Sequence, residues 1–357
     1  MQIANSSRVL VFGVIESLTF AVTRCLAAAG FKPTVLGWHH LSPLALTPDC
    51  HYVAAWEPCW VDNEINPALI DCVDQLCRQH GITAVVPADY DCALLLARHA
   101  ARLTTAQACA LPTPQLLRAL NDKWRFSEML RELELPQPQT ERIETREQLE
   151  RIALKFPLVT KPIIGWAGIG VQLHHSRAEL ERVLSEGRLA AGYPLLAQRY
   201  APGRDVGFAF LARRGRLVAY TAFEGFGRGA RRHFNDPRLR AHVATLVKAA
   251  GYHGVGEVDT RYDPVRDEYR LLEFNPRFWA SLLYSLRAGM NFPALLLQLD
   301  ELGDGPGCTA HAQRVSLGPY EMALKQATQL SERTHGLGAR MLAKWLERAR
   351  DTAAQSW

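Results

Sequence analysis

The sequence has little that would place the protein in or across a membrane. No apolar run reaches the roughly 18–20 residues that a membrane-spanning helix needs. Residues 1–11 lack the basic start, the apolar run and the small-residue cleavage site of a signal peptide. The eight cysteines contain no Cys-x-x-Cys pair, so their spacing indicates neither a zinc site nor a disulfide framework. We therefore predict a cytoplasmic protein with no integral membrane segment.

The sequence also has only a small excess of basic over acidic residues. Lysine and arginine together number 41 against 36 for aspartate and glutamate, which gives a net charge of +5 over 357 residues. This excess does not predict a nucleic-acid partner, because a basic pocket for phosphates accounts for it equally well. Hydrophobic residues make up 48% and charged residues 22%, as in ordinary globular proteins. The length is sufficient for two or three packed subdomains.

A dinucleotide-binding fingerprint is missing from the first predicted turn. This turn reads Gly13-Val14-Ile15-Glu16 and not Gly-x-Gly-x-x-Gly, so a nicotinamide or flavin dinucleotide has little support. The first hundred residues instead alternate between strand and helix patterns, which predicts a parallel sheet with helices on its faces. The predicted strands are 8–12, 34–38, 52–56 and 82–86, and the predicted helices are 17–29, 67–80 and 91–101.

The rest of the chain predicts a linker at residues 111–114 and then a second, mixed sheet. The predicted helices are 115–133, with a break near Asn121-Asp122, then 146–155 and 291–299. The predicted strands are 158–161, 195–200, 206–212, 216–222, 253–262 and 269–275. Residues 337–346 form one apolar face of a basic helix, which would pack on the protein body or on a dimer partner, with a membrane surface as the alternative.

The most informative stretch is the predicted strand that ends at Asn275. Because side chains alternate along a strand, Glu273 and Asn275 project to the same face, and Asp259 on the neighbouring predicted strand can face them. Carboxylate and amide oxygens are hard ligands that suit magnesium. Arg277 follows just after the strand, where its guanidinium could hold a phosphoryl group during transfer.

Two lysines and a glycine-containing loop add the features of a phosphate site. Lys123 stands at the start of a predicted helix, and Lys161 ends a predicted strand. A lysine ammonium group is a compact charge that suits phosphate oxygens. The loop that follows Lys161 has glycines at which backbone amides can approach phosphates closely, and it could close over a nucleotide: Gly165, Gly168 and Gly170.

These landmarks, in this order, resemble the ATP-grasp superfamily over roughly residues 110–300. Asn275-Pro276-Arg277-Phe278-Trp279-Ala280-Ser281 is similar to carboxylate–amine ligases of the carbamoyl-phosphate-synthase type. The resemblance implies an α/β and α+β protein, in which residues 1–111 form a Rossmann-like parallel-sheet domain that precedes the grasp. Residues 112–303 would form the two lobes of the ATP-grasp domain, and residues 304–357 a helical extension.

The resemblance also implies a role for each landmark. Lys123 and Lys161 would hold ATP phosphates, and Asp205 would reach the ribose or a substrate amine. Arg277 and Lys161 would be catalytic, stabilising the phosphoryl group. Two magnesium ions, with manganese as a substitute, would bind Asp259, Glu273 and Asn275. The hinge between the lobes, whose backbone would read the adenine, would be Gln198, Arg199, Tyr200 and Ala201.

This sequence departs from the pattern of the superfamily at three places. The loop reads Gly165-Trp166-Ala167-Gly168-Ile169-Gly170 and is bulkier than in many members. Asp259 stands where many relatives have glutamate, and Gln198 stands where an acid is common. None of the three changes removes a metal ligand outright, so they put the loop geometry in question and leave ATP use intact.

The implied reaction joins an acid to an amine through an acyl phosphate, with release of ADP and phosphate. The acid would be bound by arginines on a predicted loop, Arg228, Arg231 and Arg232, for which a solvated basic loop is the alternative. The partners would then be small molecules, and a homodimer is plausible. The alternative functions are an ATP-dependent kinase or carboxylase on the same fold and a nucleotide-binding regulator without turnover.

Overall fold

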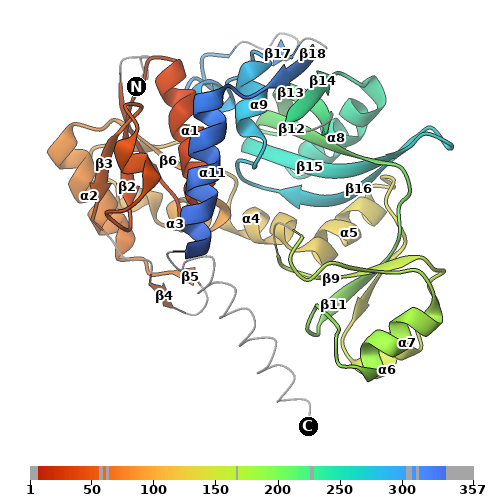
Figure 1. Ribbon diagram of the computed structural model, residues 1–357. Coiled ribbons are helices and arrows are strands. Elements are labelled where there is room, and N and C mark those ends of the chain that lie inside the picture. The colour runs from red at the N-terminus through yellow and green to blue at the C-terminus, as the bar shows by residue number, and fades with distance from the viewer. Residues whose placement is uncertain are drawn as a thin grey trace. The chain divides into compact units, whose positions relative to one another are not determined.

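The computed structural model describes residues 7–55, 59–61, 64–165, 168–225, 229–302, 308–310 and 313–334 (Figure 1). The chain divides into two compact units. Unit 1 takes its described residues from 7–118, 207–258 and 275–334, and unit 2 takes its described residues from 119–206 and 259–274. Each unit is therefore assembled from segments that are far apart in the sequence.

The first part of unit 1 is the predicted parallel sheet, with strand order β3-β2-β1-β6-β7. Its strands are β1 (Arg8–Phe12), β2 (Lys32–Gly37), β3 (His51–Ala54), β6 (Ala84–Pro87) and β7 (Gln107–Ala108). Its helices are α1 (Glu16–Ala28), α2 (Leu69–His80) and α3 (Tyr90–His99), with single turns η1 (Pro43–Leu46) and η2 (Ala100–Arg102). A two-stranded ribbon is formed by β4 (Trp60–Val61) and β5 (Glu64–Ile65). The predicted alternation of strands and helices is confirmed.

The larger sheet is mixed and has the strand order β16-β15-β12-β13-β14-β18, with β17 beside β13. Its strands are β12 (Arg204–Arg213), β13 (Arg216–Gly225), β14 (Ala230–Phe234), β15 (Gly254–Asp263), β16 (Glu268–Asn275), β17 (Cys308–Thr309) and β18 (Gln313–Ser316). The helices of this part are α8 (Pro237–Ala249), α9 (Leu282–Arg287), α10 (Phe292–Leu297) and α11 (Pro319–Thr334). Strands β12, β15 and β16 contain residues of both units.

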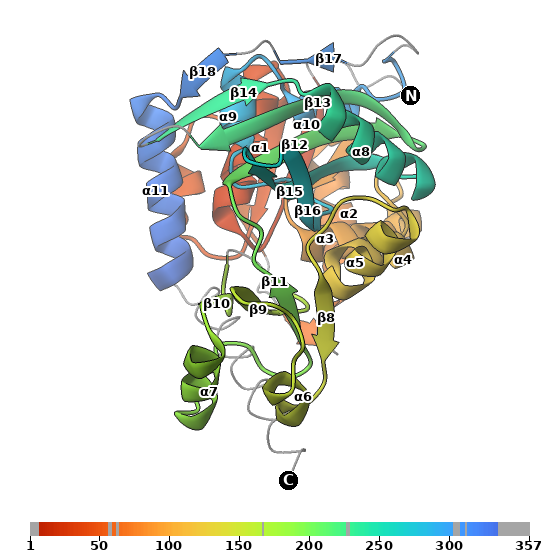
Figure 2. The same ribbon diagram turned by 90° about the vertical axis from the view of Figure 1, so that its right-hand side faces the viewer.

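A hydrophobic core connects distant segments of unit 1. It joins buried side chains of β1 and α1, such as Val9 and Phe20, to side chains of β13 and of the segment after β16, such as Phe223, Trp279 and Phe292. Helix α1 contacts α9, α10 and α11, so the first sheet and the later helices are packed together (Figure 2). This packing fixes the segment that follows β16 within unit 1.

Unit 2 contains a four-stranded antiparallel sheet with the order β10-β9-β11-β8. Its strands are β8 (Thr140–Ile143), β9 (Leu158–Pro162), β10 (Gln172–His174) and β11 (Leu195–Arg199). Its helices are α5 (Lys123–Glu132), α6 (Arg146–Glu150) and α7 (Arg177–Ser185), and α4 (Pro114–Asn121) leads into it from unit 1. The predicted break at Asn121-Asp122 is confirmed, whereas the helix predicted over 146–155 ends at Glu150.

Some predictions about organisation remain predictions. The boundaries of the three proposed domains, at 111/112 and 303/304, stay predictions. The apolar helix over 337–346 lies outside the described residues. Among the helices in the described part of the chain, none is long and apolar enough to cross a membrane.

Candidate functional site

Lys123 is fixed in place by the start of helix α5. The Asp122 side chain caps this helix by accepting hydrogen bonds from the amides of Trp124 and Arg125, both at 2.9 Å. The Lys123 amide donates to the carbonyl of Ile163 at 3.0 Å, and its ammonium group donates to the carbonyl of Gly165 at 2.9 Å. The lysine is therefore held against the first residues of the glycine-containing loop, and its side chain is only 9% exposed.

Lys161 is buried on strand β9. Its ammonium group donates to Gln198 Oε1 at 3.0 Å and to the carbonyl of Leu272 at 3.4 Å. The Gln198 amide is in turn oriented by donating to Thr140 Oγ1 at 2.8 Å. Burial lowers the pKa of Lys161 to about 8, because removal from water disfavours the charged ammonium group.

Two carboxylates lie with these lysines in unit 2. Glu273 Oε2 is 3.3 Å from Lys123 Nζ, and the Asp259 side chain interacts with Glu273. Burial acts to raise the pKa of Glu273, but the positive charges of Lys123 and Lys161 outweigh it, so the pKa lies below its ordinary value. Glu273 is therefore ionised at neutral pH. We call Lys123, Lys161, Asp259 and Glu273 the lysine–carboxylate cluster.

Asn275 and Arg277 are held together within unit 1. Arg277 Nη2 donates to Asn275 Oδ1 at 3.0 Å, and Nη1 donates to the carbonyl of Phe278 at 2.7 Å. Asn275 Nδ2 lies 3.3 Å from Glu257 Oε2, a buried carboxylate that sequence reasoning missed. The missed signal was the alternation of β15, which places Glu257 and Asp259 on the same face of the strand.

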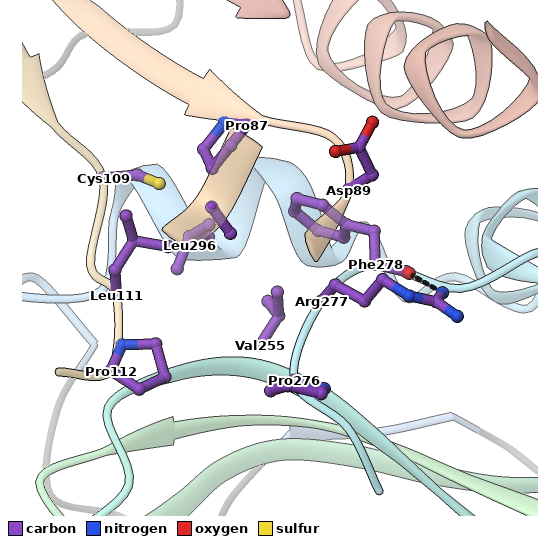
Figure 3. A pocket seen from close by; sticks show the side chains of 11 residues that line it. Pro87, Asp89, Cys109, Leu111, Pro112, Val255, Pro276, Arg277, Phe278 and Leu296 are labelled. Carbon is purple, nitrogen blue, oxygen red and sulfur yellow. Dashed lines mark hydrogen bonds between the residues drawn. The ribbon is translucent and has the colours of Figure 1, made fainter. Parts of the chain in front are cut away.

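A small apolar cavity of unit 1 adjoins Arg277 (Figure 3). Its walls include Pro87, Val255, Phe278 and the aliphatic part of Arg277, whose guanidinium group is directed away from the cavity toward the Phe278 carbonyl. Asp89 also lines it, but its carboxylate accepts hydrogen bonds from backbone amides and caps helix α3. We therefore assign Asp89 a structural role at this cavity.

The predicted hinge residues lie at the end of strand β11, with Gln198 and Arg199 inside the strand and Tyr200 and Ala201 just after it. Gln198 supports Lys161, as described above, whereas the amides of Arg199 and Tyr200 donate to the carbonyls of Gln139 and Pro157 at 2.8 and 2.9 Å. Arg261 donates to the Tyr200 hydroxyl at 3.2 Å and to Asp205 Oδ1 at 2.8 Å. The Asp205 side chain is 85% exposed, so it is accessible to a ligand. Ala201 is buried.

The glycine-containing loop keeps the conformational freedom expected of it at two positions. Gly168 and Gly170 have positive φ angles of 71° and 77°, a conformation that other residues rarely adopt. Gly165 supplies the carbonyl that binds Lys123. Trp166 and Ala167 lie outside the described residues.

The arginines predicted to bind the acid do not share a loop. Arg231 and Arg232 lie on strand β14, which pairs with β13 and β18, so their side chains project to opposite faces of the sheet. Arg232 donates to the buried Glu224 at 2.7 Å, whereas Arg231 lies over the ring of Tyr284. The prediction of a loop at these two residues was wrong, and Arg228 lies outside the described residues.

The donor chemistry fits magnesium together with nucleotide phosphates. Within the described part of the chain, no group of three or more His, Cys, Asp or Glu side chains forms a metal site by itself. Magnesium is, however, commonly bound through one or two carboxylates together with substrate phosphates. Asp259 and Glu273 supply such a pair, and the adjacent ammonium groups of Lys123 and Lys161 favour phosphate oxygens.

Comparison with known families finds similarity in the second half of the chain, and curated proteins also match part of it. The family model described as "ATP-grasp in the biosynthetic pathway with Ter operon" matches residues 193–316. The carbamoyl phosphate synthase large chain of Methanoculleus marisnigri is 25% identical over an alignment of 187 residues that covers 46% of this chain. The matched part is only 17% of that relative's length.

Solved structures extend the likeness to most of the chain. The biotin carboxylase domain of Hydrogenobacter thermophilus 2-oxoglutarate carboxylase, solved with MgADP and bicarbonate, has a TM-score of 0.63 and 17% identity, covering 85% of this chain and 71% of its own. An L-amino acid ligase from Bacillus licheniformis has a TM-score of 0.60 and 17% identity, covering 82% and 73%. At these identities the likeness concerns the fold, and it confirms the fold class predicted from the sequence.

Proposed function

This chain belongs to the ATP-grasp superfamily, and on that premise we propose that it is an ATP-dependent carboxylate–amine ligase. The observation that carries the proposal is the lysine–carboxylate cluster. It places two ammonium groups beside an ionised carboxylate within one unit. Nucleotide phosphates and magnesium together need this combination of charges.

The proposed reaction has two steps. First, an oxygen of the substrate carboxylate attacks the γ-phosphorus of ATP, the bond from that phosphorus to the β–γ bridging oxygen breaks, and ADP leaves. Second, the nitrogen of an amine attacks the acyl carbon, the bond from that carbon to the phosphate oxygen breaks, and phosphate leaves. The amine loses its proton to solvent. The product is an amide.

The chain's own groups act mainly by positioning and by neutralising charge. Lys123 and Lys161 would hold the phosphates of the nucleotide, and Arg277 would face the charge that develops on the transferring phosphoryl group. Asp259, Glu273 and Asn275 would hold magnesium, which neutralises phosphate charge when bound. We add Glu257 to this proposal, because it is the buried partner of the Asn275 amide.

The remaining assignments are proposals of the same kind. The backbone of Gln198, Arg199, Tyr200 and Ala201 would read the adenine, with Asp205 toward the ribose or the amine. Gly165, Gly168 and Gly170 would close over the phosphates. A cytoplasmic location and a homodimer also remain proposals.

A release assay for ADP and phosphate tests this function. The purified chain is supplied with MgATP and with paired panels of carboxylic acids and amines, and the same panels are run with acid alone, with amine alone and with bicarbonate. A ligase forms ADP together with an amide, and only when an acid and an amine are both present. ADP with a stable phosphorylated product would indicate a kinase, and dependence on bicarbonate would indicate a carboxylase. Nucleotide binding without turnover on any pair would contradict catalysis.

A matched pair of variants on strand β16 controls this assay. Glu273→Gln removes a charge from the lysine–carboxylate cluster, whereas Glu268→Gln removes the same charge from a more exposed position on the same strand. We expect Glu273→Gln to lose at least about a hundredfold in turnover while it stays folded, and Glu268→Gln to keep full turnover. Equal turnover in the two variants would exclude Glu273 from the reaction.

A further inference from the structure

Two cations of unit 1 lie against one aromatic ring. The guanidinium carbon of Arg231 is 5.1 Å from the centroid of the Tyr284 ring, and Lys325 Nζ is 5.4 Å from the same centroid. Lys325 Nζ also donates to the carbonyl of Ala280 at 2.8 Å. Attraction between a cation and the face of a ring fixes both side chains in position. We call Arg231 and Lys325 the cation pair.

The charge of the cation pair is not balanced by acids. Within the described ranges, neither Arg231 nor Lys325 forms an ion pair with a carboxylate, and Arg231 donates a hydrogen bond to the carbonyl of Ala230 at 2.9 Å. Burial lowers the pKa of Lys325, and the nearby charge of Arg231 lowers it further. Two like charges held near one another raise the free energy of the unliganded protein.

Neighbouring basic residues in the same region show what structural pairing looks like. Arg287 on helix α9 donates to Glu321 on helix α11 at 2.8 Å. Lys325 lies four residues after Glu321 on α11, and therefore one turn further along the same helix face. On β14, Arg232 is likewise paired with Glu224. Only the cation pair departs from this pattern among these residues, which indicates that its counter-charge comes from a ligand.

The position of the cation pair connects it with the proposed reaction. Asn275, Arg277, Ala280 and Tyr284 follow one another on the segment that leaves β16 and enters α9. The ammonium group of Lys325 is therefore hydrogen-bonded to the carbonyl of Ala280, three residues after Arg277. Both cations are partly exposed, and Arg231 pairs across β13 and β14 with Gly225, which has no side chain of its own.

We propose that Arg231 and Lys325, held by Tyr284, bind a second anionic group of the acid substrate, either a carboxylate or a phosphate. The proposal rests on the proposed ligase function, because it assigns Arg277 and the lysine–carboxylate cluster to the reacting carboxylate and the nucleotide. An arginine fork and a lysine ammonium group together match the oxygens and the charge of such a group. The substrate class is accordingly an acid with two anionic groups.

Calorimetric titration of the full chain tests this proposal. The protein is first saturated with Mg²⁺ and a nonhydrolysable ATP analogue, so that the nucleotide phosphate positions are filled. It is then titrated with inorganic phosphate, with succinate and with acetate. We expect tighter binding than that of acetate, by at least about tenfold, for succinate, whose second carboxylate can reach the cation pair, or for phosphate, which carries more charge and more oxygens on one group. The preference between phosphate and succinate identifies the second group, and either preference supports the site.

Variants locate the binding. Lys325→Met and Arg231→Met should each weaken binding of the preferred anion by at least about tenfold, while Lys325→Arg, which keeps the charge, should stay within about threefold of the wild type. Lys248→Met, which removes an exposed lysine from helix α8, is the matched control and should leave the affinity unchanged. Thermal melting confirms that each variant is folded.

Two results would contradict binding of an anionic group by the cation pair. One is wild-type affinity for phosphate and succinate that does not exceed the affinity for acetate. The other is equal anion affinity in the wild type, Lys325→Met and Arg231→Met. In both cases nucleotide binding and ADP formation would persist, whereas failure of the proposed ligase function appears separately as a loss of those two activities in the wild type.

Discussion

Two pairs of cations in this protein are balanced in different ways. In unit 2, Lys123 and Lys161 lie with the carboxylates of Glu273 and Asp259. In unit 1, Arg231 and Lys325 share the ring of Tyr284, and no acid pairs with them in the described part of the chain. A balanced cluster can accept a metal and phosphates together, whereas an unbalanced pair attracts an anion alone. On the proposed function, the first pair binds the nucleotide and the cation pair binds the second anionic group of the substrate.

The largest effect is expected from removing a cation of the lysine–carboxylate cluster. Lys123→Met removes a phosphate-binding charge and leaves Glu273 without its closest cation, so we expect the affinity for MgADP to fall by about a hundredfold. Lys325→Met changes the unbalanced pair and should leave the affinity for MgADP within about twofold of the wild type. Calorimetric titration with MgADP measures both. Equal losses in the two variants would show that the pairs do not have separate roles.

The next largest effect is a dependence of stability and of nucleotide binding on pH, through Lys161. Burial holds the pKa of Lys161 at about 8, below the ordinary lysine value of 10.5, so the unfolded chain binds this proton more tightly than the folded chain between these two values. The contribution of Lys161 to the free energy of unfolding therefore increases as pH rises from about 8 to 10.5. Nucleotide binding has the opposite dependence, because phosphates prefer the charged ammonium group.

We expect the affinity for MgADP to fall by about tenfold between pH 7.5 and 9.5. Lys161→Arg should remove this dependence, because an arginine remains charged over the whole interval. Titrations at three pH values in that interval measure both proteins. A wild-type affinity that does not change with pH would show that Lys161 does not contact the phosphates as an ammonium group.

The smallest effect concerns stability at the contact between α9 and α11. Arg287→Gln leaves the buried carboxylate of Glu321 without its main partner and should lower the free energy of unfolding by about 1 kcal/mol. Lys325→Met removes an unbalanced charge from the same contact and should not lower it. Thermal melting of the unliganded protein compares the two variants. A larger loss in Lys325→Met than in Arg287→Gln would contradict the absence of a counter-charge at Lys325.

The parts of the fold that depend on local pattern could be predicted from the sequence. The alternation of the first hundred residues, the break at Asp122 and the strand that ends at Asn275 are all encoded by neighbouring residues. The helix after Arg146 was predicted too long, because Ile152 and Leu154 enter the core of unit 2 after the helix has ended. Packing of this kind overrides local propensity.

The parts of the candidate site that depend on distant segments could not be predicted. Arg231 and Arg232 looked like a loop because glycines precede them, but they form a strand that pairs with β13 and with β18, which comes from much later in the chain. The residues around Lys325 in the sequence do not indicate a binding role, because that role depends on its contact with the ring of Tyr284 on another helix. Strand alternation alone would have predicted Glu257 on the same face as Asp259.

The most direct measurement of the central claim is the dependence of ADP binding on magnesium in the wild type and in Glu273→Gln. If Asp259 and Glu273 hold the metal beside Lys123 and Lys161, magnesium should strengthen ADP binding to the wild type by at least about tenfold. The same addition should strengthen binding to Glu273→Gln by less than about twofold. A full magnesium effect in Glu273→Gln would contradict the proposed site.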